Sequence, residues 1–380
     1  MPTESSAASR GRVARAMRPV ATLPEGDTEP AGHDAGTLEA LTRRIATLLG
    51  QPFAAGGVPE ATGVSGMAYL VPQRTLDARQ AGRLGIRSDA DLFGGVVPHL
   101  FVSTKITSHP VLEDADGVPA AWVHALAARI AGAVLPGFTV FSARDARRAW
   151  RRLRRLGPLR LKLAHGIGGQ GQFLLEHPDD LDAALDGRAG EALASTGGSL
   201  ELHLFEPETW SVGWVECGPW RASYVGSQRS TRNGQGDEVY DGSDLTVVRG
   251  GADALDGLEV DSVFGRGITL ARSYHAAVAA SYPGFFASRC NYDVIHGLDQ
   301  AGAARTGVLE QSWRIGGASS AEIAAMAAFA SDASLALVHA SSHEVYGAFQ
   351  PPSNADVHYQ GIDPRWGPMT KYSVLARHGH

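Results

Sequence analysis

The sequence predicts a mixed α/β fold assembled from more than one packed unit. At 380 residues the chain is longer than a single ordinary hydrophobic core, so two or three units that share a cleft are expected. Apolar residues recur at helical spacing over residues 38–48, whereas residues 67–71 form a short apolar run that is typical of a strand. Hydrophobic residues make up 44% of the chain and charged residues 19%, the balance of a globular protein.

Charge and cysteine content narrow the expected partners. The net charge of -6 disfavours wholesale binding of nucleic acid, which favours a basic face, so small molecules are the expected ligands. The two cysteines, Cys217 and Cys290, have no metal-binding spacing, which argues against a disulfide scaffold or a zinc site and favours a reducing cytoplasm. No segment approaches the roughly 20 apolar residues of a membrane span, and residues 1–21 lack a secretory signal. We therefore expect a cytoplasmic protein that binds neither membrane nor nucleic acid; a homodimer is left open.

Composition and turn residues divide the chain into five segments. Residues 1–36 are rich in small, polar and charged residues without apolar periodicity, which predicts a disordered extension. The other segments are a small N-terminal α/β domain over residues 37–100, two larger units over 101–200 and 201–346, and an irregular tail over 347–380.

Helix and strand signals then follow in order. Ser142 precedes a basic helix over residues 143–156, whose arginines we interpret as a solvated face rather than a nucleic-acid surface. Strands are expected over 159–163, 173–176, 200–205 and 210–217, an amphipathic helix over 261–280, a hairpin of strands 290–296 and 306–309 around Gly302, and an alanine-rich helix after Gly317 that extends to about His343.

A glycine-rich loop over residues 165–171 formally contains G-x-G-x-x-G, the pattern of a dinucleotide-binding turn. Such a turn must open into a helix, whereas residues 172–175 are apolar and strand-like. A P-loop is excluded because no Lys-Ser or Lys-Thr follows the glycines. The remaining interpretation is a glycine hairpin whose backbone amides bind phosphates, with Lys162 on the entering strand supplying charge. A purely structural hairpin with an exposed lysine is the alternative.

Two acidic segments follow the loop. Between Glu201 and Glu208, a strand can offer backbone hydrogen bonds to an adenine edge and a carboxylate to a ribose. Further on, Asp293 and Glu310 converge if their strands pair as a hairpin, and two neighbouring carboxylates suit Mg²⁺ bound to nucleotide phosphates. Arg314 shares the face of Glu310 and could neutralise a transferring phosphate. Ordinary surface charges are the alternative for both segments.

In this order, the motifs resemble the ATP-grasp superfamily over roughly residues 65–345, and in particular the bacterial DUF3182 family. The resemblance implies an ATP-grasp fold in which two subdomains clamp the nucleotide. It also implies ATP and Mg²⁺ as ligands. The residues implied for the nucleotide are Lys105, Lys162, Gly168, Gly169, Gln170, Gly171, Glu201, His203, Leu204 and Glu208, and those implied for the metal are Asp293, Glu310 and Ser312. The usual motif of the superfamily has Asn where this sequence has Ser312, whose hydroxyl is a poorer Mg²⁺ ligand.

The resemblance further implies a ligase that activates a carboxylate as an acylphosphate for attack by an amine or thiol. The acceptor, a small-molecule or peptide carboxylate, is not identified by the sequence. Polar residues over 227–234 and 240–244 are expected as loops that wall its pocket, and Arg249, with Arg314, is a candidate for binding an anionic group. Because Ser312 replaces Asn, a regulatory protein that binds ATP at a degenerate site is the alternative.

Overall fold

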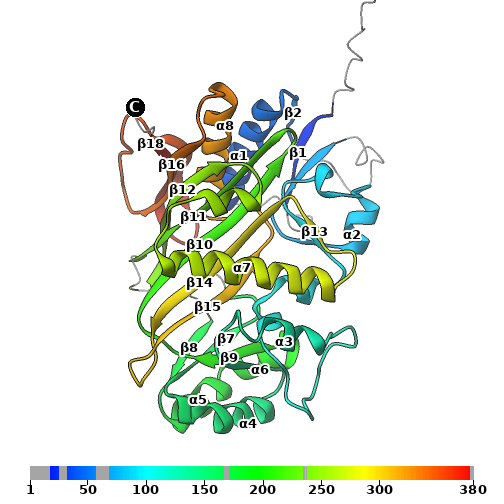
Figure 1. Ribbon diagram of the computed structural model, residues 1–380, viewed down its shortest axis with the longest axis vertical. Coiled ribbons are helices and arrows are strands. Elements are labelled where there is room, and N and C mark those ends of the chain that lie inside the picture. Colours follow the sequence, from blue (N-terminus) through cyan, green and yellow to red (C-terminus); the bar gives the residue numbers. More distant parts are fainter. Residues whose placement is uncertain are drawn as a thin grey trace, which may run out of the picture.

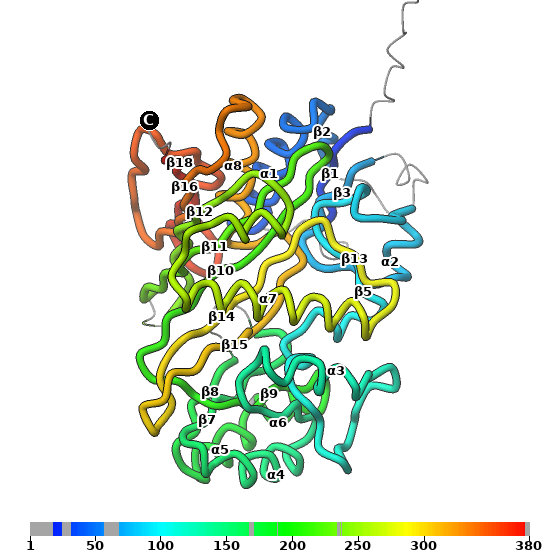
Figure 2. Tube along the Cα trace, viewed as in Figure 1, coloured from blue at the N-terminus to red at the C-terminus, as the bar shows by residue number. Residues whose placement is uncertain are grey.

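The computed structural model describes residues 18–24, 32–56, 68–166, 171–233, 236 and 238–376. Within these residues the strands form four sheets, of which the largest has eight strands. Figures 1 and 2 show long strands above a smaller α/β body that contains α3–α6 and β6–β9, with the N-terminal elements beside the upper end of the strands. No helix in the described part of the chain combines the length and the apolar character that a membrane crossing needs.

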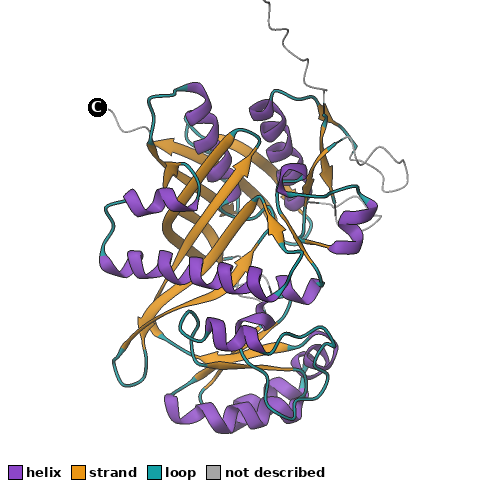
Figure 3. Ribbon diagram, turned by 45° about the vertical axis from the view of Figure 1, so that its right-hand side comes forward, coloured by secondary structure: helices purple, strands orange, loops and turns teal. Residues whose placement is uncertain are grey.

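The large sheet has the order β15-β14-β10-β11-β12-β16-β18-β17, and all its pairs are antiparallel. Alternation along the strands gives it two apolar faces. One is covered by α7, and the other by α1 and α8 (Figures 1 and 3). The elements are β10 (Phe205–Cys217), β11 (Trp220–Arg232), β12 (Glu238–Arg249), α7 (Ser262–Ser281), β14 (Arg289–Leu298), β15 (Ala304–Ser312), α8 (Ser319–Ser331), β16 (Leu337–Tyr346), β17 (Asp356–Asp363) and β18 (Gly367–Ala376).

The smaller body is a four-stranded antiparallel sheet of order β6-β9-β7-β8. Its strands are β6 (Gly137–Val140), β7 (Leu159–Leu163), β8 (Gln172–Leu175) and β9 (Gly198–Leu202), and its helices are α3 (Ala125–Ile130), α4 (Ala143–Leu153), α5 (Pro178–Asp186) and α6 (Arg188–Thr196). Ser142 caps α4 by accepting a hydrogen bond from the Asp145 amide, as predicted. Because β7 and β8 pair as neighbours, the glycine segment joins two strands, which confirms the hairpin and rules out a dinucleotide-binding turn.

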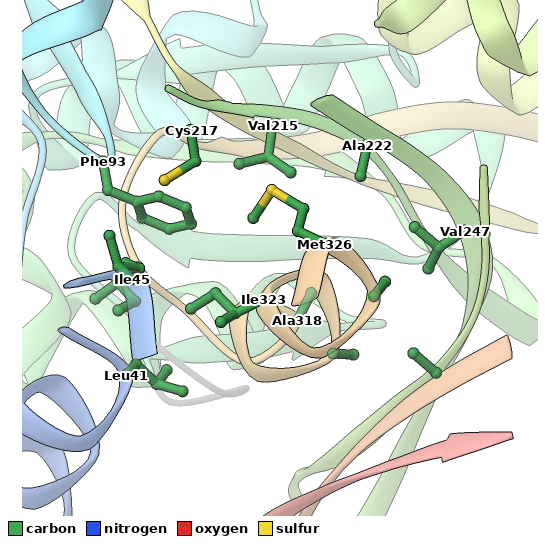
Figure 4. Packing of buried hydrophobic residues seen from close by; sticks show 14 of the residues in the cluster. Leu41, Ile45, Phe93, Val215, Cys217, Ala222, Val247, Ala318, Ile323 and Met326 are labelled. Carbon is green, nitrogen blue, oxygen red and sulfur yellow. The ribbon is translucent and has the colours of Figure 1, made fainter. Parts of the chain in front are cut away.

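The N-terminal elements, joined by the distant strand β13, form two small sheets, β2-β1-β3 and β13-β5-β4. Their elements are β1 (Val20–Leu23), α1 (His33–Leu49), β2 (Phe53–Ala54), β3 (Tyr69–Pro72), β4 (Leu76–Asp77), α2 (Ala78–Arg83), β5 (Gly95–Val97) and β13 (Phe286–Ala287). Figure 4 shows Leu41 and Ile45 of α1 on one side of Ile323 and Met326 of α8, with Val215 of the large sheet above Met326. The first long helix is therefore part of the core of the large sheet. The free cysteines Cys217 and Cys290 are both buried.

Four expectations about chain organisation are wrong. Within the expected disordered extension over 1–36, most of which lies outside the described residues, Val20–Leu23 forms a half-buried strand, because it pairs with β3. The expected irregular tail over 347–380 contains β17 and β18, which add to the edge of the sheet. The alanine-rich helix ends at Ser331, and the residues up to His343 belong to β16. Segments 227–232 and 240–244, which were expected to be loops, belong to strands β11 and β12.

Candidate nucleotide and metal site

The predicted lysines and acids lie where the small body meets the large sheet. Lys105 begins a 3-10 turn, Lys105–Ser108, that leads into the small body, and its Nζ lies 3.0 Å from Glu310 Oε2 on β15. Burial would raise the pKa of Glu310, but the nearby charge of Lys105 lowers it, and Lys162 lowers it further. Both lysines therefore lower the pKa of one carboxylate, although Lys105 precedes the small body in sequence and Lys162 lies on β7 within it.

Lys162 sits on β7 in a buried charge cluster. Its Nζ lies 2.5 Å from Glu201 Oε1, and Glu201 Oε2 lies 2.9 Å from His109 Nε2. Burial alone would raise the pKa of Glu201, but Lys162 and His109 together lower it to about 2. Glu201 therefore forms an ion pair with Lys162, the lysine that was expected to bind phosphate. The sequence did not identify His109, which lies 92 residues before Glu201 and has no motif around it.

Asp293 and Glu310 face each other across the β14–β15 ladder as directly opposite residues. Opposite residues of an antiparallel pair project on the same face, so the convergence expected from the sequence is present. Burial, and then the charge of Glu310, raise the pKa of Asp293 to about 7. Two partly buried carboxylates this close disfavour being charged together unless a cation lies beside them.

Amide side chains that the sequence did not identify as site residues surround Asp293. Gln228 Nε2 lies 2.7 Å and Asn291 Nδ2 lies 2.8 Å from Asp293 Oδ1. Gln228 comes from β11, two strands away, and also donates to Ser211 Oγ at 3.0 Å. The sequence signal for Asn291 was its place two residues before Asp293, which puts both side chains on one face of the strand.

Ser312 occupies a different environment from the metal acids. Its hydroxyl accepts a hydrogen bond from Arg289 Nη1 at 3.2 Å, and the same guanidinium donates to the Arg314 carbonyl at 2.7 Å. Arg289 is in turn held by Glu322 of α8, with Nη2 2.6 Å from Oε1. Arg314 is partly buried, and desolvation, then the charge of Arg289, lower its pKa. Ser312 thus lies against a cation, a poor position for a metal ligand.

The strand expected to contact the adenine and ribose joins the two sheets. Leu204 is buried against Leu135 and Leu202, whereas Glu208 is exposed on β10. His203 Nδ1 lies 3.3 Å from Arg160 Nη2, and burial, then the charge of Arg160, lower the pKa of His203. The backbone at Glu206 has φ 48°, so the chain changes direction between His203 and Glu208. The structure therefore places these residues on the connection between the bodies.

Of the other sequence candidates, three lie outside the described residues, and two lie away from the cluster. Gly168, Gly169 and Gln170 lie outside the described residues, and Gly171, with φ 68°, ends the loop beside Leu163. Arg249, the last residue of β12, packs against the C-terminal end of α8. Its guanidinium donates to the carbonyls of Phe329, Asp332 and Leu335 at 2.8–2.9 Å. It also lies 4.9 Å from the ring centroid of Phe329. Arg249 therefore completes the hydrogen bonding of a helix end, and its expected role in binding an anionic group stays a prediction.

The donor set fits Mg²⁺ at Asp293 and Glu310. Within the described residues no group of three or more His, Cys, Asp or Glu side chains is placed to hold a metal ion. Mg²⁺ does not require such a cage, because it is usually bound by one or two carboxylates together with phosphate oxygens and water. The two facing carboxylates, with two buried lysines around them, provide that minimal set.

The comparisons with known proteins give a family and a fold. The family described as "Protein of unknown function (DUF3182)" matches residues 21–373. No curated protein matches the sequence. Among solved structures, phosphoribosylamine–glycine ligase from Thermotoga maritima superposes with a TM-score of 0.50 at 11% identity, covering 94% of this chain and 91% of that chain.

Two further structures are similar over smaller shares. D-alanyl-alanine synthetase A from Vibrio cholerae gives a TM-score of 0.39 at 15% identity, covering 64% of this chain and 66% of that chain, just under two thirds of its length. D-cycloserine synthetase gives 0.40 at 12% identity, covering 73% of this chain and 86% of that chain. At these identities the likeness concerns the fold. The chain has the ATP-grasp fold and belongs to the DUF3182 family.

Proposed function

We propose that this protein is an ATP- and Mg²⁺-dependent ligase that joins a carboxylate to an amine or thiol. The observation that carries the proposal is the meeting of Lys105 and Lys162 with Asp293 and Glu310 at the junction of two sheets. Cations for phosphate and paired acids for a divalent ion are the two groups that phosphoryl transfer from ATP requires. The name of the structure that superposes over most of the chain, phosphoribosylamine–glycine ligase, supports the same class.

The proposed reaction has two steps. A carboxylate oxygen of the substrate attacks the γ-phosphorus of ATP, and the bond to the bridging oxygen breaks, so that ADP leaves and an acylphosphate forms. An amine or thiol then attacks the acyl carbon and loses its proton, and inorganic phosphate leaves. The carboxylate needs this activation because it is a poor electrophile.

The chain's own residues would bind and orient the reactants. Lys105 and Lys162 supply positive charge toward the phosphates, and Glu201 holds the lysine of β7 in place. Asp293 and Glu310 would hold Mg²⁺, which supplies charge neutralisation at the transferring phosphoryl group. Arg314, a partly buried electrostatic neighbour of Arg289 and Glu310, would add positive charge to the site.

The test is to incubate the protein with ATP, Mg²⁺ and panels of amino acids, small carboxylic acids and peptides, and to follow ADP and phosphate. With a productive acceptor, an ¹⁸O-labelled carboxylate should transfer one label to the released phosphate. Glu310→Gln is the matched control, because it keeps the shape of the side chain and removes the charge. Release of AMP and pyrophosphate would contradict the acylphosphate.

The second candidate is a regulatory protein that binds ATP without turning it over. The contact between Ser312 and Arg289 favours it, because this position offers a hydroxyl that already accepts from a guanidinium. Metal-dependent ATP binding without turnover on any acceptor, combined with turnover in Ser312→Asn, would establish this candidate.

A further inference from the structure

Two rows of residues run across four neighbouring strands of the large sheet on the side of α8. In one row Gly226 of β11, Ser211 of β10, Asp293 of β14 and Glu310 of β15 are in register, and in the next row Tyr224, Gly213, Asn291 and Ser312. Residues in register share a face, and so do residues two apart on one strand. Asn291 therefore lies beside Asp293 and directly opposite Ser312.

Gly213 allows Tyr224 to reach Asn291 across the intervening strand. A Cβ at Gly213 would lie 2.3 Å from the Tyr224 hydroxyl oxygen, so no other residue leaves room for it. The hydroxyl oxygen consequently lies 3.0 Å from Asn291 Oδ1 and 2.6 Å from Glu322 Oε1. Asn291 is only 6% exposed, so its amide must find its partners within the protein.

The Tyr224 hydroxyl has one hydrogen and two neighbours that can accept it. A carboxylate at 2.6 Å is the stronger acceptor, since hydrogen bonds to ionised groups are roughly twice as strong as neutral ones. Glu322 also forms an ion pair with Arg289, whose Nη2 lies 2.6 Å from the same oxygen. The single hydrogen therefore goes to Glu322, and Asn291 Oδ1 is left facing the oxygen of Tyr224 without a hydrogen between them.

Rotation of the amide by 180° satisfies this contact. Nitrogen and oxygen of an amide have nearly the same shape, and the hydrogen-bond network decides their places. In the rotated side chain Nδ2 donates to Tyr224, and Oδ1 takes the place 2.8 Å from Asp293 Oδ1. Two oxygens then face each other beside Glu310, an arrangement that a cation between them stabilises.

Ser312 offers no equivalent oxygen. Its hydroxyl already lies 3.2 Å from Arg289 Nη1, and that guanidinium also donates to two backbone carbonyls. A metal ion at Ser312 would face this buried positive charge. Across the ladder, Asn291 has no guanidinium within hydrogen-bond distance among the contacts of the described residues.

We propose that Asn291 gives its side-chain oxygen to the Mg²⁺ held by Asp293 and Glu310, and that Ser312 gives none. The inference rests on the proposed function, because it concerns the metal of the same nucleotide site. It assigns the amide ligand to β14, on the strand opposite the position where the ATP-grasp motif has its Asn. Tyr224, oriented by Glu322, is the positioning residue that sets the direction of the amide.

The experiment measures Mn²⁺ affinity in the presence of the non-hydrolysable analogue AMP-PNP, from the electron paramagnetic resonance signal of free Mn²⁺. Asn291→Ala should weaken Mn²⁺ binding about tenfold or more. Asn291→Asp, which keeps an oxygen at the same reach, should bind Mn²⁺ at least as tightly as the wild type. Ser312→Ala, the matched control on the facing strand, should bind with wild-type affinity.

Thermal unfolding without metal shows whether each variant is folded. If Asn291→Ala cannot be purified, Asn291→Ser provides the test, since its hydroxyl is too short to replace the amide oxygen and the same loss is expected. Equal affinity of Asn291→Ala and the wild type, or an equal loss in Ser312→Ala, would overturn the assignment and leave the proposed function standing. Failure of the wild type to bind Mn²⁺ with AMP-PNP would overturn both.

Discussion

At the scale of single residues, the decisive contact is the one between Lys162 and Glu201. Both side chains are buried, and a buried charge without its partner is far more costly than the pair is stabilising. A single substitution at Lys162 therefore has two effects at once. It removes a positive charge that could bind phosphate, and it removes the ion-pair partner of Glu201. Variants must separate these effects.

The double variant Lys162→Met with Glu201→Gln achieves this separation. It removes both charges, so we expect it to fold with near-native stability and to lose the thermal stabilisation by ATP. Lys162→Met alone should lose ATP binding and also unfold more easily, by about 3 kcal/mol, because Glu201 remains charged. Differential scanning fluorimetry with and without ATP measures both. ATP stabilisation that persists in the double variant would show that Lys162 does not contact the nucleotide.

Glu201 also predicts a pH dependence of stability. Its pKa falls from an ordinary value of 4.5 to about 2 in the folded protein, so its contribution is fully present above pH 4.5 and is lost as the pH falls toward 2. The shift corresponds to about 3 kcal/mol at neutral pH. Between pH 7 and pH 3 the wild type should lose more unfolding free energy than Glu201→Gln, as measured by denaturant titration. Parallel pH curves for the two proteins would contradict this account.

At the scale of elements, the end of α8 depends on Arg249. Its three hydrogen bonds satisfy carbonyls at and beyond the last turn, which have no partners within the helix. We expect Arg249→Ala to lower the unfolding free energy by about 2 kcal/mol and to leave stabilisation by ATP unchanged. Stabilisation by ATP, measured as the shift in melting temperature, distinguishes the two roles. It should stay unchanged if Arg249 is structural and decrease if Arg249 binds the nucleotide.

The crossing of Tyr224 over β10 gives a second prediction at this scale. In Gly213→Ala the new methyl group would lie 2.3 Å from the Tyr224 hydroxyl oxygen and 2.5 Å from the Cys290 carbonyl oxygen. Since one of these atoms is backbone, the strands must shift, and we expect a loss of about 1–3 kcal/mol. Gly82→Ala in α2 is the control: nothing lies within 4 Å of its added Cβ, so helix propensity should make that variant slightly more stable.

Elements whose signals are local could be predicted from the sequence. The β7–β8 and β14–β15 hairpins, the capped α4 and the helix after Asp261 all follow from turn residues, caps and periodicity close by in the chain. The strands β1, β17 and β18 could not be predicted, because short or polar strands become stable only through pairing with distant segments. His109, Gln228 and the role of Arg249 could not be predicted either, because each depends on a partner that is far away in sequence.

At the scale of the whole molecule, the proposed nucleotide site combines groups from two bodies. Lys162 belongs to the small sheet, while Asp293 and Glu310 belong to the large one, so a ligand that contacts all three stabilises both bodies together. A hundredfold excess of ATP and Mg²⁺ over the dissociation constant should raise the unfolding free energy by about 2.7 kcal/mol. NAD should give no shift under the same conditions. A shift with NAD and none with ATP would refute the nucleotide assignment.

Relative movement of these two bodies can be measured with dyes attached to introduced cysteines, because both native cysteines are buried. Burial raises the pKa of the Cys217 thiol and of the Cys290 thiol to about 12, so at neutral pH neither offers the thiolate that alkylating dyes require. Cysteines introduced at exposed positions such as Glu191 on α6 and Arg266 on α7 would therefore react selectively in the otherwise native chain. A fluorophore pair at these positions would report directly whether ATP brings the small body toward the large sheet.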